Sequence, residues 1–339
     1  MSSTKYNFPV FILILSVAIF MPLVTQGENV IRAAIDIGSG GPKLRVAEVD
    51  LNTNKIVRIL CIKQYPVIFH ESLADGNRIL NHEIMAQGIS AIREAIALAK
   101  SFEVSGIVII GASIFRAAVN GELFASDIYS ATGLNVHILD QDLEGKLAFQ
   151  AAQAQMNISS ENLIAWDIGG GSIQFVGTLA DGSYFIDGSD EGSGPFRDFI
   201  IESIKHQDLK ECRTPNPLSQ EQANLAEEHA AALSRDVDSI LKNRIRNPDT
   251  IIVGVGTVFG RGIANLLNQK NPFTIDDLAI VLKRLIGKND DDLGGAYACV
   301  EVSNVLLALG FMKELNIKEM RTVDVNNADG AMVYEPFWH

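Results

Sequence analysis

The chain has 339 residues, of which 47% are hydrophobic and 20% charged, and this composition excludes a disordered protein. The length suits two domains of ordinary size. The formal net charge of −13 argues against a nucleic-acid-binding surface and against a long basic channel, because both need clustered lysine and arginine. A local basic pocket is compatible with this charge.

The first 27 residues predict a signal peptide. Lys5 precedes an uncharged apolar run at 8–24, and the small residues that follow place the expected cleavage near Gly27. The run contains two prolines and is short for a stable membrane span, which favours a cleaved signal peptide over a retained anchor. A retained N-terminal anchor is the alternative. We therefore expect a periplasmic or secreted protein, or one anchored to the membrane by this segment.

Cysteine and histidine patterns do not indicate a metal centre. Cys61, Cys212 and Cys299 form no CxxC motif, so one disulfide at most is expected, and three isolated buried thiols are the simpler interpretation. The six histidines form no HExxH motif, and we expect no zinc site.

The first half of the mature chain predicts a strand, a glycine-rich turn and a second strand. Residues 30–38 are a buried strand that enters "DIGSGGPKL", and residues 43–51 alternate apolar and polar side chains as a half-buried strand does. Asn81 is a candidate N-cap for the next helix. The further elements expected are strands at 55–69 (one or two), 104–113 and 135–140, and helices at 81–102, 114–133 and 142–156.

The second half repeats this order. A strand enters "DIGGGSIQF" at 167–175, a strand or hairpin follows, and Ser219 with Gln222 fits a capping box. Thr274 is a candidate cap for a later helix. The further elements expected are helices at 194–206, 220–245, 275–287 and 300–316, strands at 249–257 and 321–325, and surface loops at 247–250 and 289–295.

The repeat predicts a duplicated α/β fold with a cleft between two domains, at 28–143 and 144–339. A Walker loop or a Rossmann turn leads from a strand into a helix. Here both glycine turns lead from a strand into a strand, so they are hairpin turns.

The paired turns suit a phosphate chain. Glycine lets backbone amides converge on one point, and such a concavity binds phosphate oxygens. Serine adds a hydroxyl in each copy, and an aspartate before each turn supplies an oxygen ligand of the kind that Mg²⁺ prefers. The phosphate-binding residues expected are Gly38, Ser39 and Gly40 in the first turn and Gly169, Gly170, Gly171 and Ser172 in the second, with Asp36 and Asp167 as metal ligands.

Two further charged residues are candidates for hydrolytic chemistry. Arg116 follows a buried strand, from which its guanidinium could reach the cleft and neutralise phosphoryl oxygens. Glu144 begins a helix beside the domain junction, where a carboxylate can accept a proton from attacking water. The alternatives are a solvated helix residue for Arg116 and a first-turn helix acid for Glu144.

The motifs "AAIDIGSGGPKLRVAEV", "GASIFRAAVN", "LEGKLAF", "AWDIGGGSIQFV", "IIVGVGT" and "DGAMVYE" together resemble the exopolyphosphatase/guanosine pentaphosphate phosphohydrolase family. The resemblance extends over residues 31–335. It implies two duplicated actin-like (ribonuclease H-like) domains and hydrolysis of a phosphoanhydride with Mg²⁺.

The resemblance also implies individual roles. Glu144 matches the family glutamate that activates water, Asp167 matches a Mg²⁺ ligand, and Arg116 matches the arginine of a phosphate-binding loop. The further phosphate-binding residues implied are Lys43, after the first turn, and Gly254, Gly256 and Thr257 in the third glycine segment.

Three positions depart from the family pattern. Gln174 stands where the family has a glutamate; an amide cannot act as a base, but it can orient a water, and the related apyrases carry Gln in the similar turn. The segment at 254–257 is shorter than the family's GxGGT pattern, and the C-terminal motif at 327–335 lacks the arginine of the family's GLREG. These departures bear on the substrate and on the metal geometry.

The leading hypothesis is an extracytoplasmic Mg²⁺-dependent hydrolase that releases terminal phosphate from polyphosphate or nucleoside polyphosphates, with Glu144, Gln174 and Arg116 as catalytic residues. The alternatives are an apyrase-like hydrolase of nucleoside tri- and diphosphates and a non-catalytic family member that binds phosphate chains. A dinucleotide site at 253–262 does not explain the duplicated turns, and a sugar kinase would share the fold alone. No nucleic-acid partner is expected, and a homodimer is compatible with the sequence.

Overall fold

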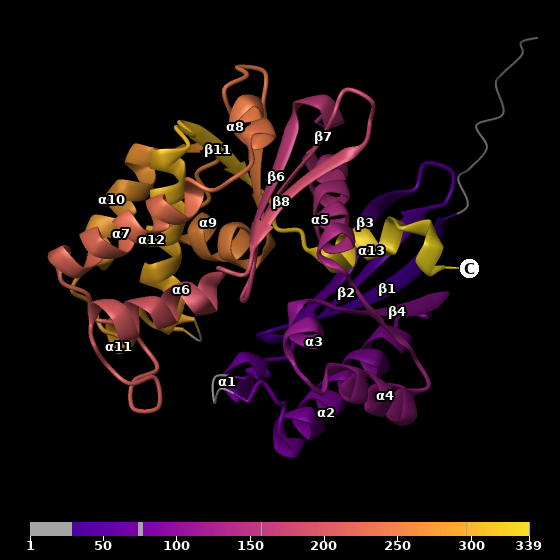
Figure 1. The fold of residues 1–339 in the computed structure, drawn as a ribbon. Helices are drawn as coiled ribbons and strands as arrows, with labels where there is room; N and C mark the ends of the chain where they lie inside the picture. Colours follow the sequence, from indigo (N-terminus) through magenta and orange to yellow (C-terminus); the bar gives the residue numbers. More distant parts are fainter. Residues whose placement is uncertain (1–28, 74–76, 157, 296, 339) are drawn as a thin grey trace, which may run out of the picture.

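A computed structural model describes residues 29–73, 77–156, 158–295 and 297–338 (Figure 1). The predicted signal segment therefore lies outside the described residues. Among the described helices, none combines the length and apolar character that a membrane crossing requires.

Two mixed β-sheets form the centres of two lobes. The first sheet has the order β3-β2-β1-β4-β5, and the second has the order β10-β11-β9-β6-β7-β8. The first contains β1 (Asn29–Gly38), β2 (Gly41–Asp50), β3 (Lys55–Gln64), β4 (Gly106–Gly111) and β5 (Val136–Ile138). The second contains β6 (Leu163–Ile168), β7 (Ile173–Thr178), β8 (Tyr184–Ser189), β9 (Ile251–Val255), β10 (Phe273–Thr274) and β11 (Glu319–Thr322).

The sheets repeat one topology. In each, three consecutive strands pair antiparallel, and the first of them also pairs in parallel with a later strand: β1 with β4, and β6 with β9. The duplicated α/β fold predicted from the two glycine turns is therefore confirmed. The two glycine turns connect equivalent strand pairs, β1–β2 and β6–β7, so each turn has the same position in its own lobe.

Helices of the first lobe cover one face of its sheet. They are α1 (Phe69–Leu73), α2 (His82–Lys100), α3 (Ser113–Ala117) and α4 (Gly121–Thr132), and the predicted N-cap Asn81 accepts a hydrogen bond from the Ile84 amide. The single helix expected at 114–133 is wrong. Asn120 exchanges side-chain hydrogen bonds with the backbone of Leu80, and this holds the chain out of helical geometry between α3 and α4.

The second lobe has a larger helical layer on one side of its sheet (Figure 1). The side chains of Trp166, Phe175, Phe259 and Phe311 form an aromatic cluster under this layer. The elements of the layer are α6 (Ser193–Phe199), π-helical segments η2 (Ile200–Ile204) and η3 (Val258–Ile263), α7 (Gln220–Ser234), α8 (Ser239–Ile245), α9 (Ala264–Leu266), α10 (Ile275–Leu285), α11 (Asp290–Leu293) and α12 (Ala298–Glu314). The opposite face carries α5 (Gln141–Met156), whose Phe149 packs with Val176 and Val253, and η1 (Ser160–Asn162) precedes β6.

Local capping explains where these helices begin. The capping box at Ser219 and Gln222 is present, and Thr274 caps α10. The predicted single helix at 220–245 is divided, because the Asp238 side chain accepts a hydrogen bond from the Ile240 amide and starts α8. The loop expected at 289–295 contains the short helix α11, which Asn289 caps.

The chain passes between the lobes twice, into α5 and into α13 (Asn327–Val333), and η4 (Glu335–Phe337) follows (Figure 1). Ala331 and Met332 of α13 pack in one core with Ala34 of the first sheet, although the predicted boundary assigns 144–339 to the second domain. That boundary falls within α5 and stays a prediction. The three cysteines are free and partly exposed, which corrects the expectation of buried thiols.

Candidate active site

The two glycine turns face each other across the interface between the lobes. A Cβ atom placed on Gly170 of the second turn would lie 1.8 Å from the Ser39 hydroxyl oxygen of the first. The backbone of the second turn can approach Ser39 this closely because Gly170 has no side chain. The structure therefore brings the two predicted phosphate-binding segments to one place.

Backbone amides in both turns are free to bind an anion. Within the described parts of the chain, the amides of Ser39, Gly40, Gly170 and Gly171 donate no hydrogen bond. The amide of Gly169 is engaged, because it donates to the Ser172 carbonyl at 2.8 Å and closes the hairpin. Four unpaired N–H groups from two facing turns form the kind of concavity that binds phosphate oxygens.

The N-terminus of α6 supports the second turn from behind. The amide of Ser193 donates to the Gly169 carbonyl at 2.9 Å, and the amide of Gly194 donates to the Gly170 carbonyl at 2.8 Å. A Cβ on Gly192 would lie 2.3 Å from the Ser172 amide nitrogen, so only glycine fits there. This support was not predicted from the sequence. The two glycines of "EGSG", next to the start of a predicted helix, are the sequence feature that could have indicated it.

Ser113 is a further residue of the site that the sequence did not indicate. It is the first residue of α3, directly after β4, and its hydroxyl oxygen would lie 3.4 Å from a Cβ on Gly171. The hydroxyls of Ser39 and Ser113 therefore both lie beside the second turn.

The aspartates before the turns lie at equivalent register positions. Asp36 of β1 is opposite Lys43, and Asp167 of β6 is opposite Gln174. Asp36 is 3% exposed and its Oδ1 has no hydrogen-bond partner among the described residues. Burial raises the pKa of Asp36, and the positive charge of Lys43 opposes this rise. Burial, followed by the negative charge of Glu144, raises the pKa of Asp167 to about 7.

Glu144 and Arg116 form an ion pair at this site. The Arg116 Nη2 atom lies 2.8 Å from Glu144 Oε2, and Arg116 Nη1 donates to the Leu139 carbonyl at 2.6 Å. Glu144 is 6% exposed, and its burial raises its pKa although Arg116 acts in the opposite direction. Arg116 is therefore held in place through its guanidinium, which the alternative of a solvated helix residue does not describe. Glu144 does lie in the first turn of α5, as its alternative states, and it is in addition a buried acid paired with Arg116.

Gln174 lies beside Glu144 with an unsatisfied amide. Its Oε1 would be 3.1 Å from a Cβ on Gly145, the residue after Glu144, and the side chain is 3% exposed. Neither its Oε1 nor its Nε2 makes a hydrogen bond of good geometry within the described residues, although the amide lies close enough to Glu144 to oppose the rise in the pKa of that carboxyl. A buried amide with both atoms unpaired is costly, and a water bound next to Glu144 would satisfy it.

Comparison with known proteins agrees with this geometry. Residues 49–181, which include Arg116, Glu144, Asp167 and Gln174, match the model of the Ppx/GppA phosphatase family. The predicted family resemblance is confirmed.

Solved Ppx/GppA structures share the fold. The Ppx/GppA enzyme of Aquifex aeolicus superposes with a TM-score of 0.69 at 17% identity, covering 90% of this chain and 99% of that one. An exopolyphosphatase from Cytophaga hutchinsonii gives a TM-score of 0.69 at 14% identity, covering 88% and 96%. These superpositions show that the chain shares the two-domain actin-like fold of these proteins.

A curated relative matches over a shorter region. The bifunctional 3-dehydroquinate synthase/phosphatase of Fusobacterium nucleatum is 24% identical over 153 residues, which are 44% of this chain. The chain spans 23% of the length of that relative.

Two glycines of the third glycine segment, for which the Ppx/GppA resemblance implied phosphate binding, have structural contacts instead. Gly254 lies inside β9, paired on both sides, and packs against Phe259. The Gly256 amide donates to the Val325 carbonyl at 2.9 Å. Gly256 has φ +75°, and a Cβ there would lie 2.3 Å from Asp167 Oδ1, so this glycine makes room for the carboxylate. Neither glycine offers a free amide to phosphate, which corrects the prediction for these two positions.

The donor set fits the Mg²⁺ implied by the Ppx/GppA resemblance. Within the described residues, no three or more His, Cys, Asp or Glu side chains group closely enough to hold a metal by themselves. Mg²⁺ commonly keeps several waters and uses one or two carboxylates together with substrate phosphates. Asp36, with an unpaired oxygen, and Asp167 are suitable for that mode of binding.

Proposed function

We propose that this chain is a phosphoanhydride hydrolase that releases the terminal phosphate of a polyphosphate or nucleoside polyphosphate. The observation that carries the proposal is the convergence of two amide-lined turns beside a buried glutamate. The match of residues 49–181 to the Ppx/GppA family model supports this class of reaction. The mechanism is supported by the different contacts of the two turns, of Glu144 and of Gln174.

The turns would hold the phosphoryl group that is transferred. The free amides of Gly40, Gly170 and Gly171, with the Ser39 hydroxyl, can donate to its oxygens. Phosphoryl transfer depends mainly on positioning and on neutralising these oxygens, and donors fixed in advance contribute most. The ammonium of Lys43, near the first turn, adds a positive charge.

Glu144 would remove a proton from the attacking water. The water oxygen forms a bond to the terminal phosphorus, the bridging P–O bond breaks, and the proton passes to the Glu144 carboxylate. Burial makes Glu144 a stronger base than an exposed glutamate, and its pairing with Arg116 fixes its orientation. The amide of Gln174 can hold this water, because both its polar atoms are unpaired.

Mg²⁺, when bound, would supply charge neutralisation at the phosphate oxygens. Asp36 and Asp167 are the residues that would hold it. We further propose that the protein works outside the cytoplasm, on the basis of the apolar run at 8–24.

An apyrase-like activity on nucleoside tri- and diphosphates is the second candidate. Gln174 favours it, because the Ppx/GppA pattern has a glutamate at this position and the apyrases carry Gln.

Phosphate release from a substrate panel, with and without Mg²⁺, tests the proposal. The panel contains polyphosphates of several lengths, nucleoside tri- and diphosphates and guanosine pentaphosphate. We expect Mg²⁺-dependent release from at least one of them, and a decrease of about 10²–10⁴-fold in Glu144→Gln. Glu122→Gln, which removes an exposed acid from the first turn of α4, is the matched control and should keep full activity. Release from no substrate would indicate a family member that binds phosphate chains without turnover.

A further inference from the structure

A basic crevice lies between the two lobes, next to the two turns. β2 and β3 line it on one side, and the segments after β9 and β11 line it on the other. Its charged lining is Lys43, Arg45, Lys63, Arg261 and Asp324, so among the described lining residues four cations face one acid. This excess is notable in a chain with a net charge of −13. The crevice has a volume of about 10 Å³, which is the space of one water.

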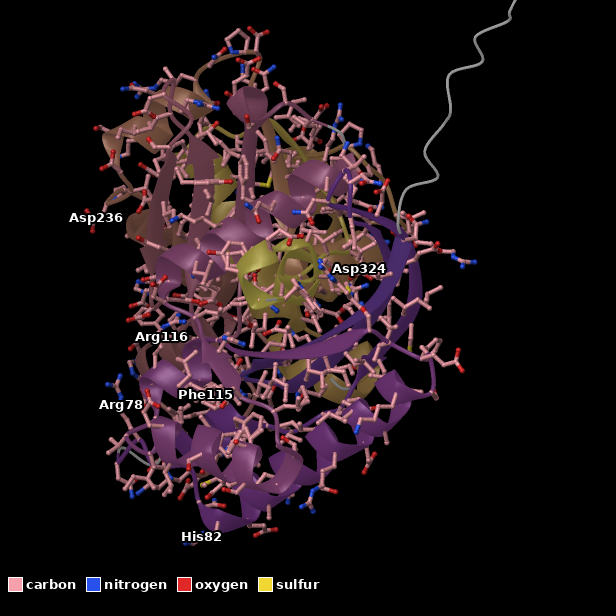
Figure 2. The ribbon with its side chains drawn as sticks, turned by 90° about the vertical axis from the view of Figure 1, so that its right-hand side faces the viewer. Arg78, His82, Phe115, Arg116, Asp236 and Asp324 are labelled. Atoms are coloured by element: carbon pink, nitrogen blue, oxygen red, sulfur yellow. The ribbon has the colours of Figure 1, made fainter. Side chains whose placement is uncertain are left out.

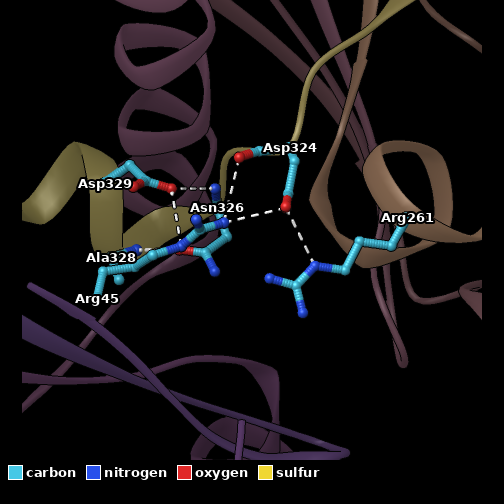
Figure 3. A network of polar contacts seen from close by, with 6 residues as sticks. All are labelled: Arg45, Arg261, Asp324, Asn326, Ala328 and Asp329. Carbon is cyan, nitrogen blue, oxygen red and sulfur yellow. Dashed lines mark hydrogen bonds and ion pairs between the residues drawn. The ribbon is translucent and has the colours of Figure 1, made fainter. Parts of the chain in front are cut away.

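Asp324 lines the crevice and binds an arginine from each lobe (Figure 3). Its Oδ1 lies 3.0 Å from Arg45 Nη2 on β2, and its Oδ2 lies 3.2 Å from Arg261 Nε. The Asp324 side chain is 41% exposed, whereas that of Arg45 is 3% exposed. The Nε of Arg45 makes no hydrogen bond and has a longer contact of 3.5 Å with Asp329. Arg45 is therefore a buried cation with spare donor capacity.

The crevice continues the site of the two turns. Lys43 lines it, and the Lys43 ammonium would lie 3.9 Å from a Cβ on Gly38. Gly256 and Thr257 line it as well, and Gly256 contacts Asp167. Arg116 is at a different place: Figure 2 shows it well apart from Asp324, which lies beside the yellow helix α13. The crevice thus extends from the turns in a direction that Arg116 does not occupy.

We propose that this crevice is a second anion subsite, and that Asp324 is an internal carboxylate that occupies it until a substrate phosphate takes its place. A phosphate offers more oxygens and more charge than a carboxylate, and arginine binds it in the same bidentate geometry. The inference rests on the proposed function, because it places the terminal phosphate between the turns and the next phosphates of the chain here. It predicts a requirement for consecutive phosphates and poor binding of a single phosphate.

Calorimetric binding of tripolyphosphate and of orthophosphate tests the subsite. Both ligands are titrated into Glu144→Gln, in which turnover is strongly slowed, and into the same protein with either Asp324→Asn or Arg261→Gln. Asp324→Asn should tighten tripolyphosphate about three- to tenfold, and Arg261→Gln should weaken it by a similar factor. Orthophosphate, which reaches only the turns, should bind all three proteins alike.

The control removes one negative charge elsewhere. Glu227→Gln breaks an exposed pair with Lys313 in the second lobe, and it should leave tripolyphosphate binding unchanged. Arg261 has a side chain 38% exposed, so Arg261→Gln is expected to fold even if Asp324→Asn does not.

Unchanged tripolyphosphate affinity in folded Arg261→Gln, or weaker affinity in folded Asp324→Asn, would overturn the subsite. The proposed function fails by a different result, which is the absence of phosphate release from every substrate by the unmodified protein.

Discussion

Three carboxylates of the site, Asp36, Glu144 and Asp167, are buried and interact electrostatically: Asp36 acts on the other two, and Glu144 acts on Asp167. Each has a raised pKa, and the charges of Asp36 and Glu144 contribute to the rise at Asp167. Gathering like charges in a poorly solvated place destabilises the folded chain, and it is common at functional sites, where a bound cation can offset the repulsion. The site therefore trades stability for function.

Asp167→Asn should make the protein more stable at neutral pH. Because the folded pKa of Asp167 is about 7 and its ordinary value is 3.8, the folded chain holds the proton more tightly, and stability is lost as the pH rises between these values. We expect a gain of about 1–2 kcal/mol above pH 7 and almost none near pH 4, measured by urea unfolding. A gain that is equal at both pH values would show that Asp167 is not the titrating group. Phosphate release should be lost.

The capped helices and the glycine turns are the elements that local sequence predicted well. Ser219 and Thr274 cap through neighbours three residues away, so the whole signal lies within one short window. The break between α3 and α4 could not be predicted from neighbouring residues, because Asn120 forms its hydrogen bond with Leu80, which is 40 positions earlier. The glycines at 192 and 194 were visible in the sequence, but their contact with the second turn was not.

Two glycine substitutions in and beside the second turn should differ in their effect on stability. In Gly170→Ala the new methyl meets the Ser39 hydroxyl, which can rotate, so stability should change by less than about 1 kcal/mol while phosphate binding weakens. In Gly192→Ala the methyl meets backbone atoms of the second turn, which cannot move independently. That change should destabilise the protein by about 2–4 kcal/mol.

Urea unfolding and tripolyphosphate titration of both variants check these expectations. In a Ser39→Gly background, Gly170→Ala should cost little further affinity, because the hydroxyl that the methyl would meet is gone. A loss in that background as large as in the unmodified protein would mean that the two turns do not meet in solution.

Contacts between distant parts of the chain organise the whole molecule. Arg32 donates to the Met332 carbonyl, 300 positions away, and its guanidinium lies 4.4 Å from the Trp338 ring centroid. Arg45 reaches Asp324 and Asp329 over a similar separation. The packing of α13 on the first sheet and the basic crevice depend on such pairs. Duplication of the motif was enough to predict two facing lobes, but no local pattern indicates which late helix returns to the first sheet.

The proposed function requires one anion to contact both turns at once, and amide chemical shifts report this contact at each turn separately. Tripolyphosphate is titrated into ¹⁵N-glycine-labelled Glu144→Gln, and the resonances of Gly40, Gly170 and Gly171 are followed. We expect the glycine resonances of both turns to shift together with one shared dissociation constant. Shifts confined to one turn, or two different dissociation constants for the two turns, would contradict it.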